Sequence, residues 1–399
     1  MFKIQSILNV RIENVAITFL IIFACFPIIP INILVDSDIR IWATRISYIV
    51  AIILALVSLR RFPVSAVCAF VYGSIIIFSA YLNRTNISEA IAITYPMVGL
   101  SLLMEWGICN KGTNFLIIVE RIFYFAIVLT FILYPFSNIL FGEGDFLIGG
   151  ENHIILPTLA ASALSLIRYS LQKCSKRHVV VNYVICTALT LVNFSGGGVV
   201  AWLVYSILFL LLSSQKKFEH VFTLAKMSLM YVLAWWGVVI LRIQNFFSWF
   251  IEDILGKSLT LTHRTEIWDQ VLSRLQGNYV FGFGPQETTN LFTINGNYDS
   301  GQSYSLTLSS HNCLLQTIYT GGIISIIPLA ILLIISSRRL LSVNSKLTRN
   351  AIVCWIAGIF AMMLVEATGV IQIIFPLSIA CAIPILVEKS NSDNRVPFD

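Results

Sequence analysis

Arg264 and His311 are the side chains best suited to chemistry in the second half of the chain. Ser309 or Ser310 is expected to N-cap a helix that begins near Leu314, so that His311 lies in its first turn. The positive end of a helix disfavours imidazolium, so we expect His311 to be neutral and able to accept a proton. The guanidinium group of Arg264 can hold an anion through two parallel hydrogen bonds. Side chains of these two types could bind an anionic group and accept a proton.

The residues around Arg264 predict an amphipathic helix over 263–275. Ile267, Val271 and Leu275 recur at helical spacing, with Trp268 beside them. This apolar stripe would lie on a membrane surface or cover the end of a helical bundle. Trp268 is expected to pack in the stripe, and stacking on a sugar ring is the alternative.

A glycine-rich turn follows in the sequence GNYVFGFGPQ, residues 277–286. Gly282 and Gly284 permit backbone N–H groups to converge on an anion or a sugar hydroxyl, although glycine and proline also simply form turns. Arg242 and Arg274 are further cations of this region, and they would contact either the substrate or lipid headgroups. The acidic residues nearby have no recognised metal-ligand spacing, so we expect no metal and no cofactor.

The composition assigns these residues to a membrane protein. Of the 399 residues, 57% are hydrophobic and 12% are charged, against roughly 25% charged in ordinary soluble domains. The mean hydropathy of +0.84 exceeds what a water-soluble core can absorb, and the scattered basic residues form no stripe for nucleic acid. Apolar runs are continuous rather than alternating, which excludes a membrane β-barrel. The sequence therefore predicts an all-α polytopic membrane protein.

Apolar runs predict about 12 membrane-spanning helices, because a helix needs about 20 apolar residues to cross the hydrocarbon. The expected spans are 15–35, 46–59, 63–82, 88–106, 115–137, 154–171, 178–195, 197–213, 220–242, 314–336, 351–368 and 371–388. The chain would form a single integral membrane domain, 1–399. Residues 243–313 would form a large loop between spans nine and ten, and loops of this length usually carry function.

Lysine and arginine residues gather in alternate loops, as at Arg60, Lys111 and Lys217. The positive-inside rule then predicts that both termini are cytoplasmic and that the large loop is on the outer side. Charged residues within spans are candidates for function because they are costly there. Glu120 and Arg121 in span five, which would point about 100° apart, are two such residues, and Glu366 at the outer end of span eleven is a third.

The segments HRTEIWDQVLSRLQGNYVFGFGPQ and SSHNCLLQTIYTGGI resemble the shared region of the O-antigen ligase and O-antigen polymerase superfamily. The shared pattern is an arginine, a tryptophan a few residues later, a G-x-G turn, and then His-Asn opening a glycine-containing helix. By motif, the resemblance covers about 70 residues of the chain. The expected layout of 12 spans is similar to that of the family over the whole chain.

The resemblance implies a bacterial inner-membrane glycosyltransferase that works at the periplasmic face without a metal and inverts the anomeric centre. It would move a glycan from an undecaprenyl-diphosphate carrier to a lipid-linked acceptor. Arg264 would contact the diphosphate, His311 would be the catalytic or acceptor-orienting residue, and Asn312 would contact the substrate. The expected partners are the undecaprenyl-diphosphate-linked oligosaccharide, inner-membrane lipid and a chain-length regulator.

One element departs from the family pattern. Family members often carry Ser-Arg-Gly between two abutted spans, with the arginine facing the diphosphate, whereas this chain has Ser195 followed by Gly196 and two more glycines. Backbone amides would take over that role, or Arg242 or Arg274 would supply the second cation. Asn152 and His153, before span six, are further candidates for glycan contacts.

Three functions follow from these observations. The first is a surface polysaccharide polymerase, which the missing Ser-Arg-Gly arginine favours because that element is familiar in ligases. The second is an O-antigen ligase, which would use the same donor and transfer the glycan to lipid A core. The third is a flippase or transporter for lipid-linked sugars, but transporters typically have short loops and residues of the central cavity at mid-membrane.

Overall fold

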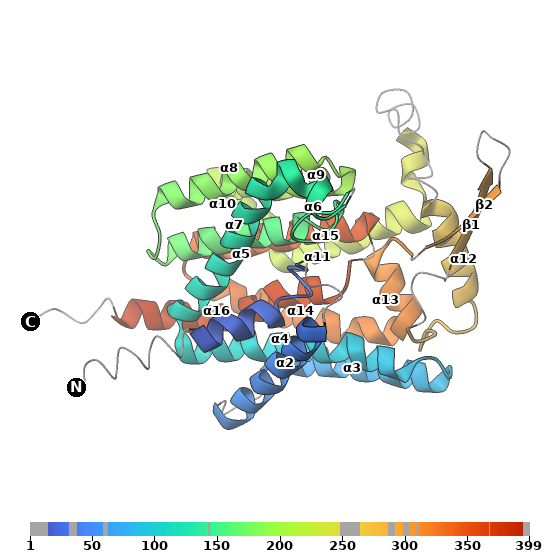
Figure 1. Ribbon diagram of the computed structural model, residues 1–399, viewed down its shortest axis with the longest axis horizontal. Helices are drawn as coiled ribbons and strands as arrows, with labels where there is room; N and C mark the ends of the chain where they lie inside the picture. Colours follow the sequence, from blue (N-terminus) through green and yellow to red (C-terminus); the bar gives the residue numbers. More distant parts are fainter. Residues whose placement is uncertain are drawn as a thin grey trace, which may run out of the picture.

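The computed structural model describes residues 15–31, 38–58, 63–142, 144–247, 264–285, 292–297, 303–308, 310–366 and 368–393. These residues form a bundle in which most long helices run in broadly the same direction (Figure 1). The prediction of a helical protein is confirmed. The described residues also contain one antiparallel hairpin, which the expectation of an all-α fold did not include.

The helices before residue 243 are α2 (Asp38–Ser58), α3 (Val64–Leu82), α4 (Ile87–Lys111), α5 (Thr113–Leu133), η2 (Tyr134–Phe136), α6 (Ser137–Leu140), α7 (Ile155–Ser170), α8 (Lys176–Asn193), α9 (Gly196–Ser214), α10 (Lys216–Val221), α11 (Leu224–Trp235) and the π-helix η3 (Trp236–Ile240). The later elements are η4 (Ile243–Phe247), α12 (Arg264–Leu275), β1 (Phe292–Asn297), β2 (Ser303–Leu308), α13 (Cys313–Gly321), η6 (Ile323–Ser325), α14 (Ile326–Leu341), α15 (Lys346–Val365) and α16 (Ile371–Asp393).

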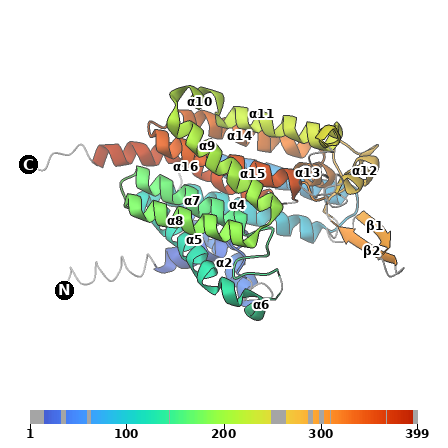
Figure 2. The ribbon, with the colours of Figure 1, turned by 90° about the horizontal axis from the view of Figure 1, so that it is seen from above.

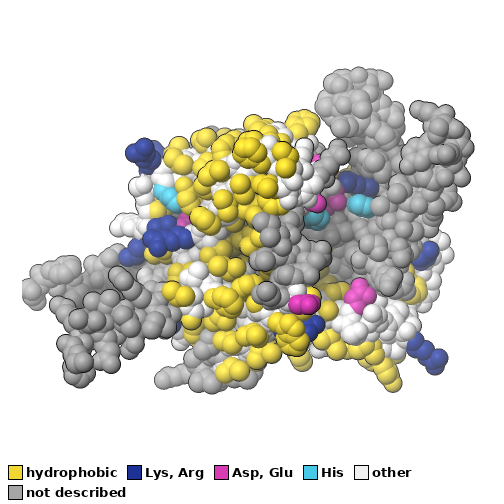
Figure 3. Space-filling view, viewed as in Figure 1, with side chains coloured by type: hydrophobic (Ala, Val, Ile, Leu, Met, Phe, Trp, Pro, Cys, Tyr) yellow, Lys and Arg dark blue, Asp and Glu magenta, His cyan; other side chains and the backbone are white. Residues whose placement is uncertain are grey.

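Six helices among the described residues are long and apolar enough to cross a membrane: Val64–Leu82, Ile87–Lys111, Thr113–Leu140, Gly196–Ser214, Ile323–Leu341 and Lys346–Val365. Four shorter apolar helices add Val15–Ala24, Ile41–Ile53, Leu224–Ile240 and Ile371–Val387. Hydrophobic side chains cover the central part of the face in Figure 3, with Lys and Arg side chains mainly toward its two ends. Exposed apolar surface this extensive is stable in lipid rather than in water.

The predicted tenth span, 314–336, is not one continuous helix. α13 ends at Gly321, Gly322 adopts φ +68°, and the chain continues through η6 into α14. Gly322 has no Cβ, so it takes this left-handed conformation without steric cost. The break leaves α13 as a short helix at the end of the molecule that also carries α12 and the hairpin (Figures 1 and 2). The described end of α16 lies at the opposite end.

α15 and α4 organise the packing. α15 lies against α9, α7 and α11, and α4 lies against α3, α2 and α16. Fully buried aromatic side chains fill the centre, and the rings of Phe123 and Phe375 stack with centroids 5.5 Å apart. This close packing makes the bundle rigid, so residues from α12, α13 and the end of α15 are held in fixed positions relative to one another.

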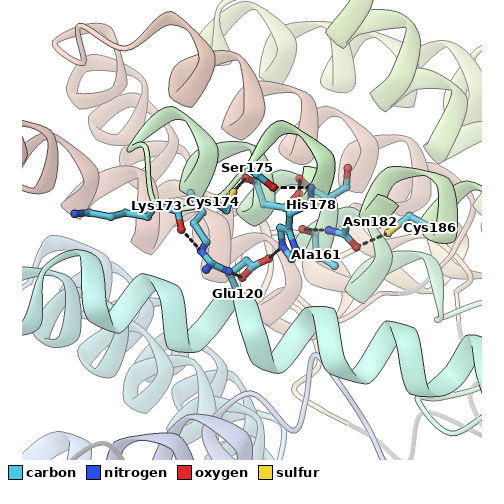
Figure 4. Close-up of polar contacts among 11 residues, drawn as sticks. Glu120, Ala161, Lys173, Cys174, Ser175, His178, Asn182 and Cys186 are labelled. Atoms are coloured by element: carbon cyan, nitrogen blue, oxygen red, sulfur yellow. Dashed lines mark hydrogen bonds and ion pairs between the residues drawn. The ribbon is translucent and has the colours of Figure 1, made fainter. Parts of the chain in front are cut away.

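A buried carboxylate joins α5, α7 and α8 (Figure 4). The Glu120 side chain is fully buried, and its oxygens lie 2.6 Å from Arg168 Nη1 and 2.7 Å from His178 Nε2. Arg121, the next residue, is exposed, as expected for neighbours that point in different directions on a helix. The carboxylate of Glu120 is therefore paired with side chains of α7 and α8, and these contacts hold α5, α7 and α8 together.

Candidate functional site

Arg264 and His311 meet at the carboxylate of Glu366. Arg264 Nη2 lies 2.5 Å from Glu366 Oε1, and His311 Nδ1 lies 3.3 Å from Glu366 Oε2. The three residues come from the start of α12, the residue two before α13, and the residue that caps the C-terminus of α15. The Glu366 side chain is 9% exposed, whereas Arg264 and His311 are 22% and 27% exposed. A buried carboxylate therefore holds two cationic or polar groups that solvent and a ligand can reach.

The surroundings of Glu366 keep it ionised. Burial alone would raise the pKa of this carboxyl, but the hydrogen bond with His311 and the positive charges of Arg264, His311 and His153 outweigh burial and lower the pKa below its ordinary value of 4.5. Opposite charges within hydrogen-bonding distance favour the charged form. At neutral pH the group is a carboxylate that accepts hydrogen bonds from both neighbours.

α12 is amphipathic as predicted, and its apolar face is buried. Ile267, Val271 and Leu275 are at most 1% exposed and pack with Trp268 in one cluster. Trp268 is fully buried and its indole Nε1 donates to the carbonyl of Ser310 at 2.9 Å. This bond ties the first half of α12 to the residue before His311. Packing is thus the role of Trp268, and the sugar-stacking alternative does not fit a ring with no exposed face.

Asn312 positions His311, because it is the N-cap of α13. Its Oδ1 accepts hydrogen bonds from the amide of Leu315 and from Trp235 Nε1, each at 2.9 Å, and its Nδ2 donates to Leu364 O at 2.8 Å. The expectation that a serine caps this helix was wrong, and His311 precedes the helix rather than lying in its first turn. Asn312 is fully buried, so its polar atoms serve the fold rather than a substrate.

The backbone of His311 is in the left-handed region, with φ +44°. Histidine adopts this conformation more often than most residues, but it remains uncommon outside glycine. Strained backbone of this kind is frequent at functional sites, where the surrounding contacts maintain it. Here the hydrogen bonds of Ser310 and Asn312 on either side hold the turn.

The glycine turn fixes the other end of α13. The N–H of Phe283 donates to Tyr319 O at 2.7 Å, and that of Gly284 donates to Thr320 O at 2.8 Å. The N–H of Gly282 donates to Asn278 O at 3.0 Å. A Cβ on Gly282 would approach Tyr319 O to 2.5 Å. These amides are used within the protein, so the interpretation of the turn as an anion-binding cradle is not supported, and its glycines permit close backbone packing.

Arg242 and Arg274 lie in different surroundings. Arg242 stacks over the Trp268 ring at 5.2 Å, and its Nη2 contacts Asp269 Oδ1 at 2.5 Å and Thr265 O at 3.0 Å. Its Nη1 is buried and has no hydrogen-bond partner among the described residues. Arg274 is exposed in the last turn of α12, about 15 Å along the helix from Arg264. Of the two, Arg242 is the cation next to the start of α12.

The N-terminus of α9 borders the same region. Ser195, its N-cap, donates a hydrogen bond to Asn152 Oδ1 at 2.8 Å. A Cβ on Gly197 would come 3.0 Å from Val365, the neighbour of Glu366, whereas a Cβ on Gly196 would meet nothing within 4 Å. His153 is exposed, and its charge contributes to the low pKa of Glu366. The loop before α7 and the start of α9 therefore form one side of the Glu366 region.

An apolar cavity of about 410 Å³ lies beside α13, next to this site. Side chains of α11, α13, α14, α15 and α16 line it, and Cys313 and Leu314 bring its lining to within two residues of His311. Tyr231, Phe360 and Met363 line it on the side of α11 and α15. The cavity has the size and apolar lining of a site for a hydrophobic ligand.

Comparison with known protein families adds evidence to this geometry. Residues 181–330 match the family model described as O-antigen ligase. The resemblance to the O-antigen ligase and polymerase superfamily is confirmed. This O-antigen ligase family region contains Arg264, His311 and the glycine turn but ends before Glu366. No curated protein and no solved structure matched the chain. The family match over residues 181–330, together with the apolar helices, indicates an integral membrane protein.

The sequence makes Glu366 a candidate for function at the outer end of a span, but it assigns this residue no role and no partner. Its sequence signal was a lone acidic residue in the apolar stretch between 351 and 387, and such residues are functional candidates. Nothing in the spacing indicated that its partners are Arg264, 102 residues earlier, and His311, 55 residues earlier. Among the described residues, no group of three His, Cys, Asp or Glu side chains is arranged to hold a metal ion.

Proposed function

We propose that the protein is a surface polysaccharide polymerase. It would transfer a glycan from an undecaprenyl-diphosphate-linked donor to a lipid-linked repeat-unit acceptor at the periplasmic face of the bacterial inner membrane. The observation that carries this proposal is the Arg264–Glu366–His311 arrangement within an O-antigen ligase family protein. It combines a fixed cation and a potential base beside an apolar cavity.

In the proposed mechanism His311 is the base. If Nδ1–H donates to Glu366, Nε2 carries the lone pair and accepts the proton of the acceptor hydroxyl. The acceptor oxygen attacks the anomeric carbon as the bond from that carbon to the diphosphate oxygen breaks. The electron pair leaves with the polyprenyl diphosphate, and a single displacement of this kind inverts the anomeric centre. Glu366 orients the imidazole and stabilises its protonated form.

Arg264 and Arg242 would hold the departing diphosphate. Arg264 retains guanidinium N–H groups beyond the one bound to Glu366, and Arg242 has a buried Nη1 that makes no hydrogen bond within the described structure. The negative charge that develops on the leaving group would be stabilised by such preorganised donors. Arg242 in this role would supply the cation that family members often carry at the position of Gly196.

The apolar cavity beside α13 would take the first part of the polyprenyl chain. Its lining begins next to His311 and runs between α11 and α14. A donor with its diphosphate at Arg264 and its lipid chain in this cavity would enter from the membrane. In the twelve-span layout, with both termini cytoplasmic, the site faces the periplasm.

The second candidate function is that of an O-antigen ligase, favoured by the description of the matching family model. Donor and site residues would be the same, and lipid A core would be the acceptor. A gene deletion separates the two functions by the surface polysaccharide that remains. Loss of a polymerase leaves single repeats on lipid A core, whereas loss of a ligase leaves core without repeats.

The direct test is chain extension by the purified protein from purified lipid-linked repeats, without nucleotide sugar. We expect the wild type to extend chains, and Arg264→Ala and His311→Ala to lose extension while they remain expressed and folded. Arg274→Ala, exposed on the same helix as Arg264, is the matched control and should remain active. Wild-type chain growth in His311→Ala would contradict the base, and absence of chain growth in the wild type would contradict the function.

A further inference from the structure

A second apolar site, which we call the α3–α14 groove, has a volume of about 370 Å³. It is lined by residues 71–78 of α3, by residues 324–331 at the start of α14, and by Phe281 of the glycine turn. The rings of Phe78 and Phe281 meet edge to face with centroids 5.6 Å apart. Both helices are apolar enough to cross a membrane, and Phe78 and Ile327 are exposed. The groove is therefore accessible to a lipid chain from the side of the bundle.

The helix α14 separates this groove from the apolar cavity beside α13. The groove is lined by Ile327, Pro328 and Ile331 of this helix, and the cavity by Ile326, Leu329, Ala330, Leu333 and Ile334. At 3.6 residues per turn, the centres of the two sets lie roughly 140° apart around the helix axis. The bundle thus has two apolar sites on different faces of one helix.

The cavity and the groove lie at opposite ends of α13. The lining of the cavity includes Cys313, two residues after His311. The lining of the groove includes Ile324, which follows the end of α13 at Gly321. The nine residues of α13 span about 14 Å. A lipid in the cavity can therefore start beside His311, whereas a lipid in the groove starts about one helix length away.

A cation lies beyond the end of the groove. Arg84 is two residues after Leu82, the last residue of α3, so their Cα atoms are at most about 7 Å apart. Arg84 is exposed and makes no ion pair within the described part of the chain. Asn83 Nδ2 donates to Gly282 O at 2.9 Å, which fixes this end of α3 against the glycine turn. An apolar groove that ends at a guanidinium complements a lipid with a phosphate headgroup.

The proposed reaction needs two lipid chains at unequal distances from His311. In the donor, the bond that breaks joins the anomeric carbon to the diphosphate, so the donor lipid must begin beside the base. In a lipid-linked acceptor, the attacking hydroxyl is separated from its own diphosphate by the sugars of the repeat unit. The acceptor lipid must therefore begin an oligosaccharide length away. The cavity meets the first requirement, and the α3–α14 groove meets the second.

We propose that the α3–α14 groove binds the polyprenyl chain of the acceptor, with the acceptor diphosphate at Arg84. The inference rests on the proposed function for the identity of the lipid, and it adds the position of the second substrate. The repeat unit of the acceptor would extend from Arg84 along α13 to His311. The helix α14 would keep the donor and acceptor chains apart.

The test uses the full-length protein in vesicles of phosphatidylethanolamine and phosphatidylglycerol. The probe is a polyprenyl-diphosphate-linked repeat unit with a diazirine in its chain. A carbon–carbon bond replaces its anomeric carbon–oxygen bond, so it can accept a glycan but cannot donate one. Phosphatidylglycerol with the same diazirine is the comparison lipid. Mass spectrometry after illumination identifies the labelled helices, and α3 contributes to the lining of the groove but not to that of the cavity.

Two matched substitutions each fill one site. Ser74→Trp fills the groove and Ser228→Trp fills the cavity. Each serine hydroxyl donates only to the carbonyl four residues earlier, at 2.9 Å, so the same kind of contact is lost in both variants. Ser88→Trp, at an exposed position outside both sites, is the control. Arg84→Asn removes the cation, and asparagine tolerates the left-handed backbone of this position, φ +54°.

We expect the probe to label α3 in the wild type. Ser74→Trp should reduce this labelling at least tenfold and slow chain extension to a similar degree. Arg84→Asn should reduce the labelling at least fivefold, whereas Arg84→Lys should retain most of it. Ser228→Trp and Ser88→Trp should leave the labelling of α3 unchanged, and Ser88→Trp should extend chains like the wild type.

Absence of α3 labelling, or labelling that Ser74→Trp leaves unchanged, would overturn the inference, and the transferase proposal would stand if the wild type still extends chains. Equal labelling by photoreactive phosphatidylglycerol, without displacement by the unlabelled analogue, would show that bilayer lipid occupies the groove and would also overturn it. Specific labelling of α3 in a protein that extends no chains would overturn the transferase proposal and leave a site for polyprenyl-linked lipid.

Discussion

Glu366 contacts one residue from α12 and one from the turn before α13, and its own position is set by the end of α15. Among the described residues, this carboxylate is the group that contacts both the Arg264 guanidinium and the His311 imidazole. With it, the guanidinium is held in place and the imidazole has a defined orientation. A carboxylate that orients a histidine is a recurrent way to prepare a base.

The substitution Glu366→Gln tests how much this carboxylate contributes to stability and to chain extension. The pKa of Glu366 is lowered below 4.5 in the folded protein, so its contribution to stability is fully present above pH 4.5 and is lost as pH falls through the folded pKa. We expect the variant to be less stable by roughly 1–3 kcal/mol and at least tenfold slower in chain extension. The stability deficit should be constant from pH 8 to 5 and should shrink below pH 4. Thermal unfolding across this range is the measurement, and a deficit that grows on acidification would contradict the ion pairs.

A second prediction at this scale compares Gly196→Arg with Gly197→Arg. A side chain at Gly196 has open space, whereas one at Gly197 meets Val365 at 3.0 Å. We expect Gly196→Arg to fold normally and to lower the KM for the lipid-linked donor severalfold, because it adds a cation beside Glu366. Gly197→Arg should lose thermal stability. Steady-state kinetics with unfolding curves distinguish the two, and an unchanged donor KM in a folded Gly196→Arg protein would argue against a phosphate near α9.

α12, the glycine turn and α13 form one structural unit, residues 264–285 and 310–322. Trp268 joins it at the His311 end, and the paired amides of Phe283 and Gly284 join it at the other. Hydrogen bonds at both ends of α13 define its position relative to α12. The geometry of Arg264 and His311 is therefore a property of the whole unit.

The prediction for this unit compares two glycines with positive φ. A Cβ on Gly322 would approach Val280 O to 1.9 Å, whereas a Cβ on Gly277 would meet nothing within 4 Å. Gly277→Ala should cost about 1–2 kcal/mol, the ordinary penalty of the left-handed conformation. Gly322→Ala should cost more and should also reduce chain extension, because the turn must move away from α13. Equal thermal midpoints for the two variants would show that the close contact is unimportant.

The buried carboxylate of Glu120 provides the other prediction for helix packing. Glu120→Gln would leave the Arg168 guanidinium, 13% exposed, without its counterion. Removing one partner of a buried ion pair typically costs about 3–5 kcal/mol. Arg121→Gln, at the exposed neighbouring position, should change stability by less than about 0.5 kcal/mol. Denaturation in detergent tests both variants, and a small effect of Glu120→Gln would mean that α5, α7 and α8 pack without the cluster.

At the scale of the whole molecule, α12 and the hairpin lie at one end of the bundle and the described end of α16 lies at the other (Figure 1). Apolar side chains cover much of the face between these ends that Figure 3 shows. If the positive-inside rule holds, the α12 end is periplasmic and the end that carries α10 is cytoplasmic.

Cysteine labelling in intact cells tests this orientation. Ser273 on α12 and Lys217 on α10 are both exposed. Ser273→Cys should react with a membrane-impermeant maleimide, and Lys217→Cys should react only after the membrane is permeabilised. The unaltered protein, whose own thiols are buried or partly buried, is the control for background labelling. The reverse pattern would put the candidate site in the cytoplasm and contradict a periplasmic glycosyltransferase.

The sequence by itself determined the membrane class, the positions of most long helices and the amphipathic pattern of α12, because these depend on composition and on local periodicity. It also made Arg264 and His311 candidates for the site, by residue type and by the family pattern. Only the tertiary structure decided that Glu366 joins them, that Asn312 rather than a serine begins α13, and that Trp268 and the glycine turn hold α12 against α13. Those outcomes depend on contacts between segments separated by tens of residues, whose distances follow from packing and cannot be read from spacing along the chain.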